Sequence, residues 1–323
     1  MARLRRSNPT GPGYRRVSHS TRVSYVDSDG RPVRDARVLE RIQGLVIPPA
    51  WNDVWISPDE FGHIQAVGTD QAGRRQYLYH RAWRERRDRV KFDRAIELAG
   101  SLPAARGVVT RDIRLPGFPE RRMLAAAFRI IDLGSLRVGS EEYLHANGSR
   151  GLSTLLCRHA RVQSNETTLS FPAKSGQRWR STIIDADLAE LVGSIKAVRG
   201  DRARLLSWQG SGWQTLYPAH INRYIRERTH GDFTAKDFRT LRGTVIAALA
   251  LAREGTRETE VGRAKVVSRA ARETAAALGN TPTVARNSYI DPRVFDRYRA
   301  GQVVDLGSGR SPEAAIRELL NDD

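Results

Sequence analysis

The chain is poor in cysteine, with a single such residue, Cys157, among 323. One thiol cannot form an intrachain disulfide, and it cannot supply the paired cysteines of a zinc site. Long apolar segments are also missing: the longest uninterrupted run, 245–252, has eight residues, whereas a helix needs about 20 to cross a bilayer. The basic first residues lead into a stretch with proline and glycine rather than an apolar one, so no secretory signal is expected. We therefore expect a cytoplasmic protein.

Several motifs of cofactor-dependent enzymes are absent. The sequence has no Walker-type phosphate loop and no GxGxxG motif after a predicted strand, so nothing favours the use of a nucleoside triphosphate or a dinucleotide. The seven histidines lack HExxH spacing, and the acidic residues are not clustered as a two-metal nuclease would need. The sequence thus predicts no cofactor and no metal.

Lysine is rare although the chain is strongly basic. Lys and Arg together number 54 against 36 Asp and Glu, which gives a net charge of +18. This excess predicts a polyanionic partner, nucleic acid first and an anionic membrane surface second, because neutralised phosphates release counterions. A lysine retained among so many arginines is a candidate for proton transfer, which arginine cannot perform near neutral pH. The five lysines are Lys91, Lys174, Lys196, Lys236 and Lys265.

The pattern of residues along the chain divides it into three parts. Residues 1–22 carry arginines, prolines and glycines but no acid, and predict a flexible basic arm. Residues 23–90 are rich in β and turn signals, with one short helix at 34–43. Residues 91–323 form a mainly helical domain, which a connecting helix at 81–99 enters.

The expected fold class is therefore α+β. Within the helical domain, 166–183 alternates as a β-hairpin with Lys174 at its tip. The other segments have helical periodicity or helix-end signals. They are 119–134, 141–145, 154–159, 185–195, 218–228, 235–252 and 258–278.

Four residues could together perform metal-free chemistry on a phosphodiester. Such a reaction needs a nucleophile, cations that stabilise charge on the phosphoryl oxygens, and an acid for the leaving oxygen. Tyr289, Arg137, Arg239 and Lys174 can supply these groups. Each one alone also fits an ordinary role: a solvated or phosphate-positioning arginine, an exposed loop tyrosine, a polar turn residue.

Their order along the chain is more specific. An arginine, a hairpin lysine, a K-x-x-R motif and a late tyrosine resemble the type IB DNA topoisomerases and, more loosely, the tyrosine recombinases. The poxvirus-like and bacterial branch of the topoisomerases is the more similar. The segments that carry the resemblance are 48–51, 73–80, 137–143, 151–155, 171–176, 236–239 and 280–292.

This resemblance implies a two-domain clamp around duplex DNA, with a small β-rich N-terminal domain and a mainly α-helical catalytic domain of the topoisomerase and recombinase kind. It implies that Tyr289 attacks a phosphodiester and joins the 3′ phosphate, while Arg137 and Arg239 hold nonbridging oxygens and Lys174 protonates the leaving 5′ oxygen. The nicked strand would rotate and be resealed without ATP or metal. A nucleoid-associated monomer is expected.

The resemblance extends to residues around the reaction. Lys236 stands where recombinases usually have histidine and topoisomerases have lysine, which favours the topoisomerases. Asn280 replaces a histidine of many members; its amide can donate to a phosphoryl oxygen but cannot carry charge. Lys236, together with Arg75, Gln76, Tyr77 and Tyr143, is expected to contact DNA. A tyrosine in a β-hairpin also commonly packs within the sheet.

Two other functions remain open at this point. A tyrosine recombinase would share Arg137, Lys174, Arg239 and Tyr289, but it would be expected to exchange a C-terminal helix between subunits, and only 34 residues follow the tyrosine. An architectural DNA-binding protein would keep the fold and the charge without the chemistry, and the intact set of four residues argues against it.

Overall fold

The computed structural model describes residues 3–18, 22–173, 176–307 and 309–321. The chain divides into two compact units, Met1–Val90 and Lys91–Asp323. Among the described residues, no helix combines the length and the apolar character needed to cross a membrane.

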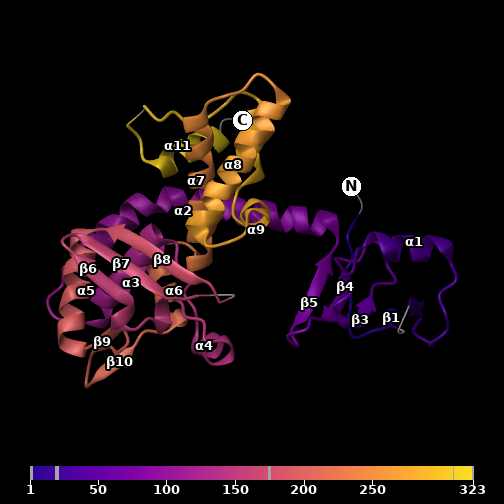
Figure 1. Cartoon of the computed structure of the whole chain (residues 1–323), viewed down its shortest axis with the longest axis horizontal. Coiled ribbons are helices and arrows are strands. Elements are labelled where there is room, and N and C mark those ends of the chain that lie inside the picture. The colour runs from indigo at the N-terminus through magenta and orange to yellow at the C-terminus, as the bar shows by residue number, and fades with distance from the viewer. Residues whose placement is uncertain (1–2, 19–21, 174–175, 308, 322–323) are drawn as a thin grey trace. The chain divides into compact units, whose positions relative to one another are not determined.

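The first unit is a five-stranded antiparallel sheet with one helix (Figure 1). Its strands follow the order β2-β1-β3-β4-β5 across the sheet. Alternation along the strands separates two faces. Ile56 and Ala66 on one face form a small core with Ile42 of the helix. The elements are β1 (Tyr14–Ser18), β2 (Val23–Val26), α1 (Ala36–Gly44), β3 (Asn52–Ile56), β4 (Ile64–Thr69) and β5 (Arg75–Tyr79).

The opposite face of this sheet carries basic and aromatic side chains. Arg15 pairs with Trp55 in register, Trp55 with Val67, and Val67 with Tyr77, so these residues line up across the sheet. A hollow of 750 Å³ on this face is lined in part by Arg15, Trp55, Val67 and Arg75. The helix-covered face thus holds the core, and the other face offers cations and aromatic rings.

The expected flexible arm at 1–22 is wrong for the described residues. Tyr14–Ser18 is strand β1, which lies between β2 and β3. Upstream, the amide of Arg5 donates to the carbonyl of Phe61 at 2.9 Å, and the amide of His63 donates to the carbonyl of Arg5 at 2.9 Å. The prolines and glycines suggested disorder, but they shape a segment whose backbone groups are satisfied by the sheet.

The second unit combines a helical bundle with two small sheets. In one sheet the strand order is β6-β7-β8, and in the other β9 pairs with β10. The helices are α2 (Arg81–Ile113, which begins in the first unit), α3 (Glu120–Gly134), α4 (Glu141–Asn147), α5 (Ala186–Arg199), α6 (Pro218–Thr229), α7 (Ala235–Glu254), α8 (Glu260–Leu278), α9 (Pro282–Ser288), α10 (Pro292–Arg299) and α11 (Pro312–Asn321). The strands are β6 (Ala160–Gln163), β7 (Glu166–Pro172), β8 (Arg178–Ile184), β9 (Ser207–Gln209) and β10 (Trp213–Thr215).

Helix α3 forms the centre of this unit. Its Phe128 is fully buried and meets Tyr224 of α6 and Phe238 of α7 edge to face, with ring centroids 6.4 and 5.2 Å apart. Such pairs add to the free energy gained by burying the rings. Asp132 and Gly134 near its end are buried too, so the chain that leaves this helix toward Arg137 starts from a fixed point.

The segment 154–159 is not the expected helix. It contains parts of two short 3₁₀ turns, Leu152–Thr154 and Cys157–His159. The amide of Cys157 donates to the carbonyl of Ala203, and the carbonyl of Leu155 accepts from the amide of Leu205, each at 2.9 Å. Because these groups bond to a distant segment, they are not available for a helical ladder.

Helix α2 extends past its expected end at residue 99 and runs through Pro103 to Ile113. Proline inside a helix costs about 3 kcal/mol. Leu102, Ala105 and Val109 are buried around it, and the burial of these side chains offsets that cost.

Gly13 tests whether the N-terminal segment belongs to the fold. A Cβ atom at this position would lie 2.2 Å from Nε1 of Trp55 and 2.7 Å from the carbonyl oxygen of Ile56. We expect Gly13→Ala to lower the free energy of unfolding of the first unit by about 1 to 3 kcal/mol through this overlap. Gly44→Ala is the control, since no atom lies within 4 Å of its Cβ position. Equal denaturant midpoints for the two variants would contradict the packing of the N-terminal segment against β3.

Candidate active site

Arg239 and Tyr289 meet inside the second unit. Arg239 is on α7 and is 3% exposed, and Tyr289 follows the last residue of α9. The guanidinium carbon lies 5.0 Å from the centroid of the tyrosine ring. The guanidinium donates to the carbonyl of Ser135, just after α3, and at 2.9 Å to that of Leu278, the last residue of α8. Two helix C-termini, where carbonyls carry partial negative charge, thus hold this buried cation.

Arg137 and Asn280 complete the group. Nη2 of Arg137 donates to Oδ1 of Asn280 at 2.7 Å. Arg137 comes three residues after the end of α3, and Asn280 comes two residues after the end of α8. The ends of α3 and α8 therefore bring both side chains to the site where Arg239 contacts Tyr289.

The two arginines change the acidity of Tyr289. Burial raises the pKa of the phenol, but the charges of Arg239 and Arg137 and their hydrogen bonds outweigh this effect, and the pKa lies below its ordinary value. Burial and the charge of Arg137 lower the pKa of Arg239, which the phenol of Tyr289 partly counters. The two arginines therefore make ionisation of Tyr289 easier than in a free tyrosine, and the phenolate is the more nucleophilic form.

Two glycines fix the segment that carries Arg137. Gly139 has φ of +74°, and a Cβ atom at Gly151 would lie 2.5 Å from the Cα atom of Gly139. The amide of Leu152 donates to the carbonyl of Arg137 at 2.9 Å, and the amide of Ser153 donates to the carbonyl of Val138 at 2.8 Å. The sequence shows both segments, but the backbone crossing that joins them appears only in the structure.

The predicted hairpin at 166–183 is confirmed as strands β7 and β8, with Phe171 paired to Trp179. Lys174, expected at its tip, lies outside the described residues. Trp179 packs over Gly279, where a Cβ atom would lie 2.5 Å from Cζ3 of the indole. This contact joins the hairpin to the turn that precedes Asn280.

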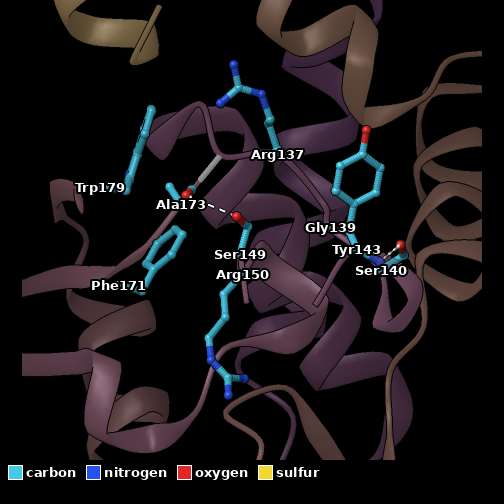
Figure 2. A pocket seen from close by; sticks show the side chains of 9 residues that line it. All are labelled: Arg137, Gly139, Ser140, Tyr143, Ser149, Arg150, Phe171, Ala173 and Trp179. Atoms are coloured by element: carbon cyan, nitrogen blue, oxygen red, sulfur yellow. Dashed lines mark hydrogen bonds between the residues drawn. The ribbon is translucent and has the colours of Figure 1, made fainter. Parts of the chain in front are cut away.

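A hollow of 340 Å³ lies between the hairpin and the Arg137 segment. Figure 2 shows the side chains that line it. Arg137 and Tyr143 are among them, as are Phe171 and Ala173, the residue before Lys174. Ser149 donates to the carbonyl of Ala173 at 3.2 Å and so attaches the end of β7 to this wall.

The expected DNA contacts lie in different environments. Tyr143 is 47% exposed at the hollow, and Lys236 is exposed on α7, three residues before Arg239. In the first unit, Arg75 and Tyr77 are exposed on β5. Gln76 points to the other face of the sheet and is half-buried, and its amide donates to a carboxylate oxygen of Asp70 at 3.0 Å.

The contacts that hold the backbone of Tyr289 could not be read from the sequence motifs. A Cβ atom at Gly243 of α7 would lie 2.5 Å from the carbonyl oxygen of Tyr289 and 2.9 Å from its Cβ atom. The hydroxyl of Thr244 lies 3.3 Å from the same carbonyl and accepts from the amide of Asp291 at 3.1 Å. A glycine inside a strong helical pattern was the one available signal of such close packing.

Comparisons with known proteins identify the family of the chain. A family model of the eukaryotic DNA topoisomerase I catalytic core matches residues 80–301, more than half of the chain, and one of the bacterial DNA topoisomerase IB N-terminal domain matches 22–70. A protein of Acanthamoeba polyphaga mimivirus named DNA topoisomerase 1B is 30% identical over 293 residues, covering 88% of this chain and 87% of its own. The chain belongs to the type IB DNA topoisomerase family. It is an enzyme of that family, and DNA is the substrate that the family implies.

The first family match spans all the residues of the candidate site, from Arg137 to Tyr289. The second ends before Arg75 and Tyr77 of β5. Within the described ranges, no group of three or more histidine, cysteine or acidic side chains is placed to hold a metal ion.

Gly243 tests the positioning of Tyr289. We expect Gly243→Ala to displace the tyrosine backbone and to lower the single-turnover rate of DNA cleavage by about 10- to 100-fold, because small displacements of a reacting group are costly. DNA binding should change little. Gly193→Ala in α5 is the matched control, since its Cβ position has no neighbour within 4 Å. Equal cleavage rates for the two variants would contradict the proposed positioning.

The charge of Arg137 beside Tyr289 should affect how the cleavage rate depends on pH. Because the charge of Arg137 lowers the pKa of Tyr289, Arg137→Ala should raise that pKa. If the phenolate attacks, the rising limb of the cleavage rate against pH should then move to higher pH, and Arg137→Lys, which keeps the charge, should move it less. Single-turnover cleavage measured over a series of buffers checks this. A limb at the same pH in all three proteins would show that Arg137 does not set the acidity of the nucleophile.

Proposed function

We propose that the enzyme relaxes supercoiled duplex DNA by transient cleavage of one strand, with Tyr289 as the nucleophile. The observation that carries the proposal is the contact of Tyr289 with Arg239, beside Arg137 and Asn280, in a chain of the type IB topoisomerase family. A lowered phenol pKa and two guanidinium groups suit attack on a phosphodiester.

The proposed cleavage step exchanges one ester for another. The phenolate oxygen of Tyr289 forms a bond to phosphorus, and the bond from phosphorus to the 5′ oxygen breaks. Lys174 gives its proton to that oxygen, which leaves a 5′ hydroxyl and a 3′-phosphotyrosine. Arg137 and Arg239 hold the nonbridging oxygens with paired donors, for which a planar guanidinium is well suited.

Asn280 has two parts in this proposal. Its carbonyl oxygen accepts from Arg137 and orients that guanidinium. Its amide nitrogen donates to the carbonyl of Leu278 at 3.3 Å, and its second hydrogen would donate to a phosphoryl oxygen when DNA is bound. Lys236, exposed on the first turn of α7, would assist through the adjacent bases or through the leaving 5′ oxygen.

Resealing is the reverse reaction. The 5′ hydroxyl attacks the phosphotyrosine after the nicked strand has rotated, and Tyr289 leaves. Because the phosphotyrosine conserves the energy of the phosphodiester, the cycle needs no ATP, and because the cations come from side chains, it needs no metal. We propose that the protein acts in this way as a monomer.

Binding is proposed to depend mostly on phosphates. The net charge of +18 favours any duplex, which also suits an association with the nucleoid. In the second unit Tyr143 and Lys236 would contact DNA near the cleaved bond. In the first unit, Arg75 and Tyr77 are exposed on β5 and would contact DNA there. Gln76 would have to give up its hydrogen bond to Asp70 before it could contact DNA.

The packing of α11 argues against the recombinase alternative. Such an enzyme would exchange a C-terminal helix between subunits. Here Ile316 and Leu320 of α11 are buried in the core of their own unit, with 0% and 4% exposure. Exchange between subunits would therefore first have to expose these two apolar side chains.

The test is relaxation of supercoiled plasmid in EDTA without ATP. Wild type should relax the plasmid, and Tyr289→Phe, which lacks only the hydroxyl, should bind DNA with unchanged affinity but relax none. If Tyr289→Phe still relaxes the plasmid, another residue is the nucleophile. If wild type does not relax it under these conditions, the proposed reaction is wrong.

A further inference from the structure

A second basic hollow lies apart from the residues assigned to the reaction. It has a volume of 290 Å³ and lies among α8, α9 and α10. Arginines from all three helices line it, namely Arg263, Arg286 and Arg299, and Glu260 is the one acidic residue in its lining. We call it the arginine hollow. Because arginines from three helices converge there, it has an excess of positive charge in a concave surface.

The charges of two of these arginines are not neutralised. Arg299 pairs with Asp296 at 2.7 Å. Arg263 donates to the carbonyl of Arg257 at 3.4 Å, and Arg286 lies over the ring of Phe295, with its guanidinium carbon 5.7 Å from the centroid. Across the described residues, neither Arg263 nor Arg286 has a carboxylate within ion-pair distance. Both keep donors for an anion.

The helix that forms one wall adds to the attraction. Glu260 is the first residue of α8 and Arg263 lies in its first turn, so the amino-terminal end of this 19-residue helix borders the arginine hollow. The N-terminus of a helix carries partial positive charge and favours anions. The dipole of α8 and the guanidinium groups therefore both attract an anion to the arginine hollow.

We propose that the arginine hollow binds a backbone phosphate of the DNA other than the one that is cleaved, and that its occupation helps to position Tyr289. This inference rests on the proposed function for its substrate. Arg286 is on α9, three residues before the nucleophile, and the amide of Tyr289 donates to the carbonyl of Ala285 at 2.9 Å. A phosphate held by Arg286 and Arg263 ties α9 to α8 and restrains the short helix that ends at Tyr289. Arg286 is thus a positioning residue.

Glu260 allows a test in which removal of a negative charge and removal of a positive charge should change DNA affinity in opposite directions. Its carboxylate opposes a bound phosphate, so Glu260→Gln should tighten DNA binding, whereas Arg286→Gln and Arg263→Gln should weaken it. A purely structural role for the three residues does not predict opposite effects from removing opposite charges.

The binding experiment uses the full chain with Tyr289→Phe, so that no cleavage occurs. Affinity for a short duplex is measured over a series of salt concentrations. Arg286→Gln and Arg263→Gln should each reduce the slope of log affinity against log salt by about 1, the value for one lost phosphate contact. Arg272→Gln is the matched control: it is exposed on the same helix, and nine residues after Arg263 it faces the opposite side. If Arg272→Gln reduces the slope as much as Arg286→Gln and Arg263→Gln do, the proposal is overturned.

The positioning part is measured with Tyr289 present. At saturating DNA, Arg286→Gln should lower the single-turnover cleavage rate by about tenfold, and Arg286→Lys, which keeps the charge, should restore most of it. A rate that stays at the wild-type value in Arg286→Gln would overturn this part.

Free phosphate is the other source of the same chemistry. Pyrophosphate without DNA is added while the melting temperature is recorded. One outcome is that pyrophosphate raises the melting temperature of wild type but not of Arg286→Gln, while the salt dependence of DNA binding is the same in both proteins. The arginine hollow would then bind free phosphate, and the assignment to DNA would be wrong. If wild type cleaves no DNA, the proposed function fails, but the salt slopes of the binding experiment still decide whether a phosphate binds here.

Discussion

The site depends on holding two cations in a partly enclosed space without cancelling their charge. A buried guanidinium needs hydrogen-bond partners, and a carboxylate would satisfy it but would also neutralise it. Among the described residues, no carboxylate pairs with Arg137 or Arg239. Arg239 donates to carbonyls at the ends of α3 and α8, and Arg137 donates to the amide oxygen of Asn280. These neutral acceptors hold both side chains without neutralising their charge, which the proposed reaction uses to bind a phosphate.

Much of the local architecture follows from this arrangement. The helix ends must meet at one place, and three close approaches that only glycine permits bring them there: Gly139 against Gly151, Gly279 under Trp179, and Gly243 against the backbone of Tyr289. The same cations lower the pKa of Tyr289 despite its burial. In the proposed reaction, one set of contacts thus holds the phosphate-binding cations and raises the acidity of Tyr289.

The sequence predicted the residue types that meet at the site, but not the contacts that support them. The order of Arg137, Lys174, Arg239 and Tyr289 and the β7–β8 hairpin depend on side-chain identity and alternation, which are visible in a sequence. The carbonyl of Ser135 is backbone and carries no such signal, so its contact with Arg239 could not be foreseen.

The errors in the fold have a similar cause. Basic residues interspersed with proline and glycine predict a flexible arm that includes Tyr14–Ser18, and the local pattern predicts a helix at 154–159, but the structure has a strand and two 3₁₀ turns there. In both cases hydrogen bonds to residues far away in the sequence decide the local structure. Local patterns do not contain that information.

The central claim is that Tyr289, held between Arg239 and Arg137, becomes joined to DNA. The most direct measurement is to denature the enzyme during reaction with duplex DNA, digest the adduct with a protease and a nuclease, and identify the modified peptide by mass spectrometry. The account predicts a nucleotide joined through its 3′ phosphate to Tyr289. A nucleotide on another residue, or one joined through a 5′ phosphate, would contradict it.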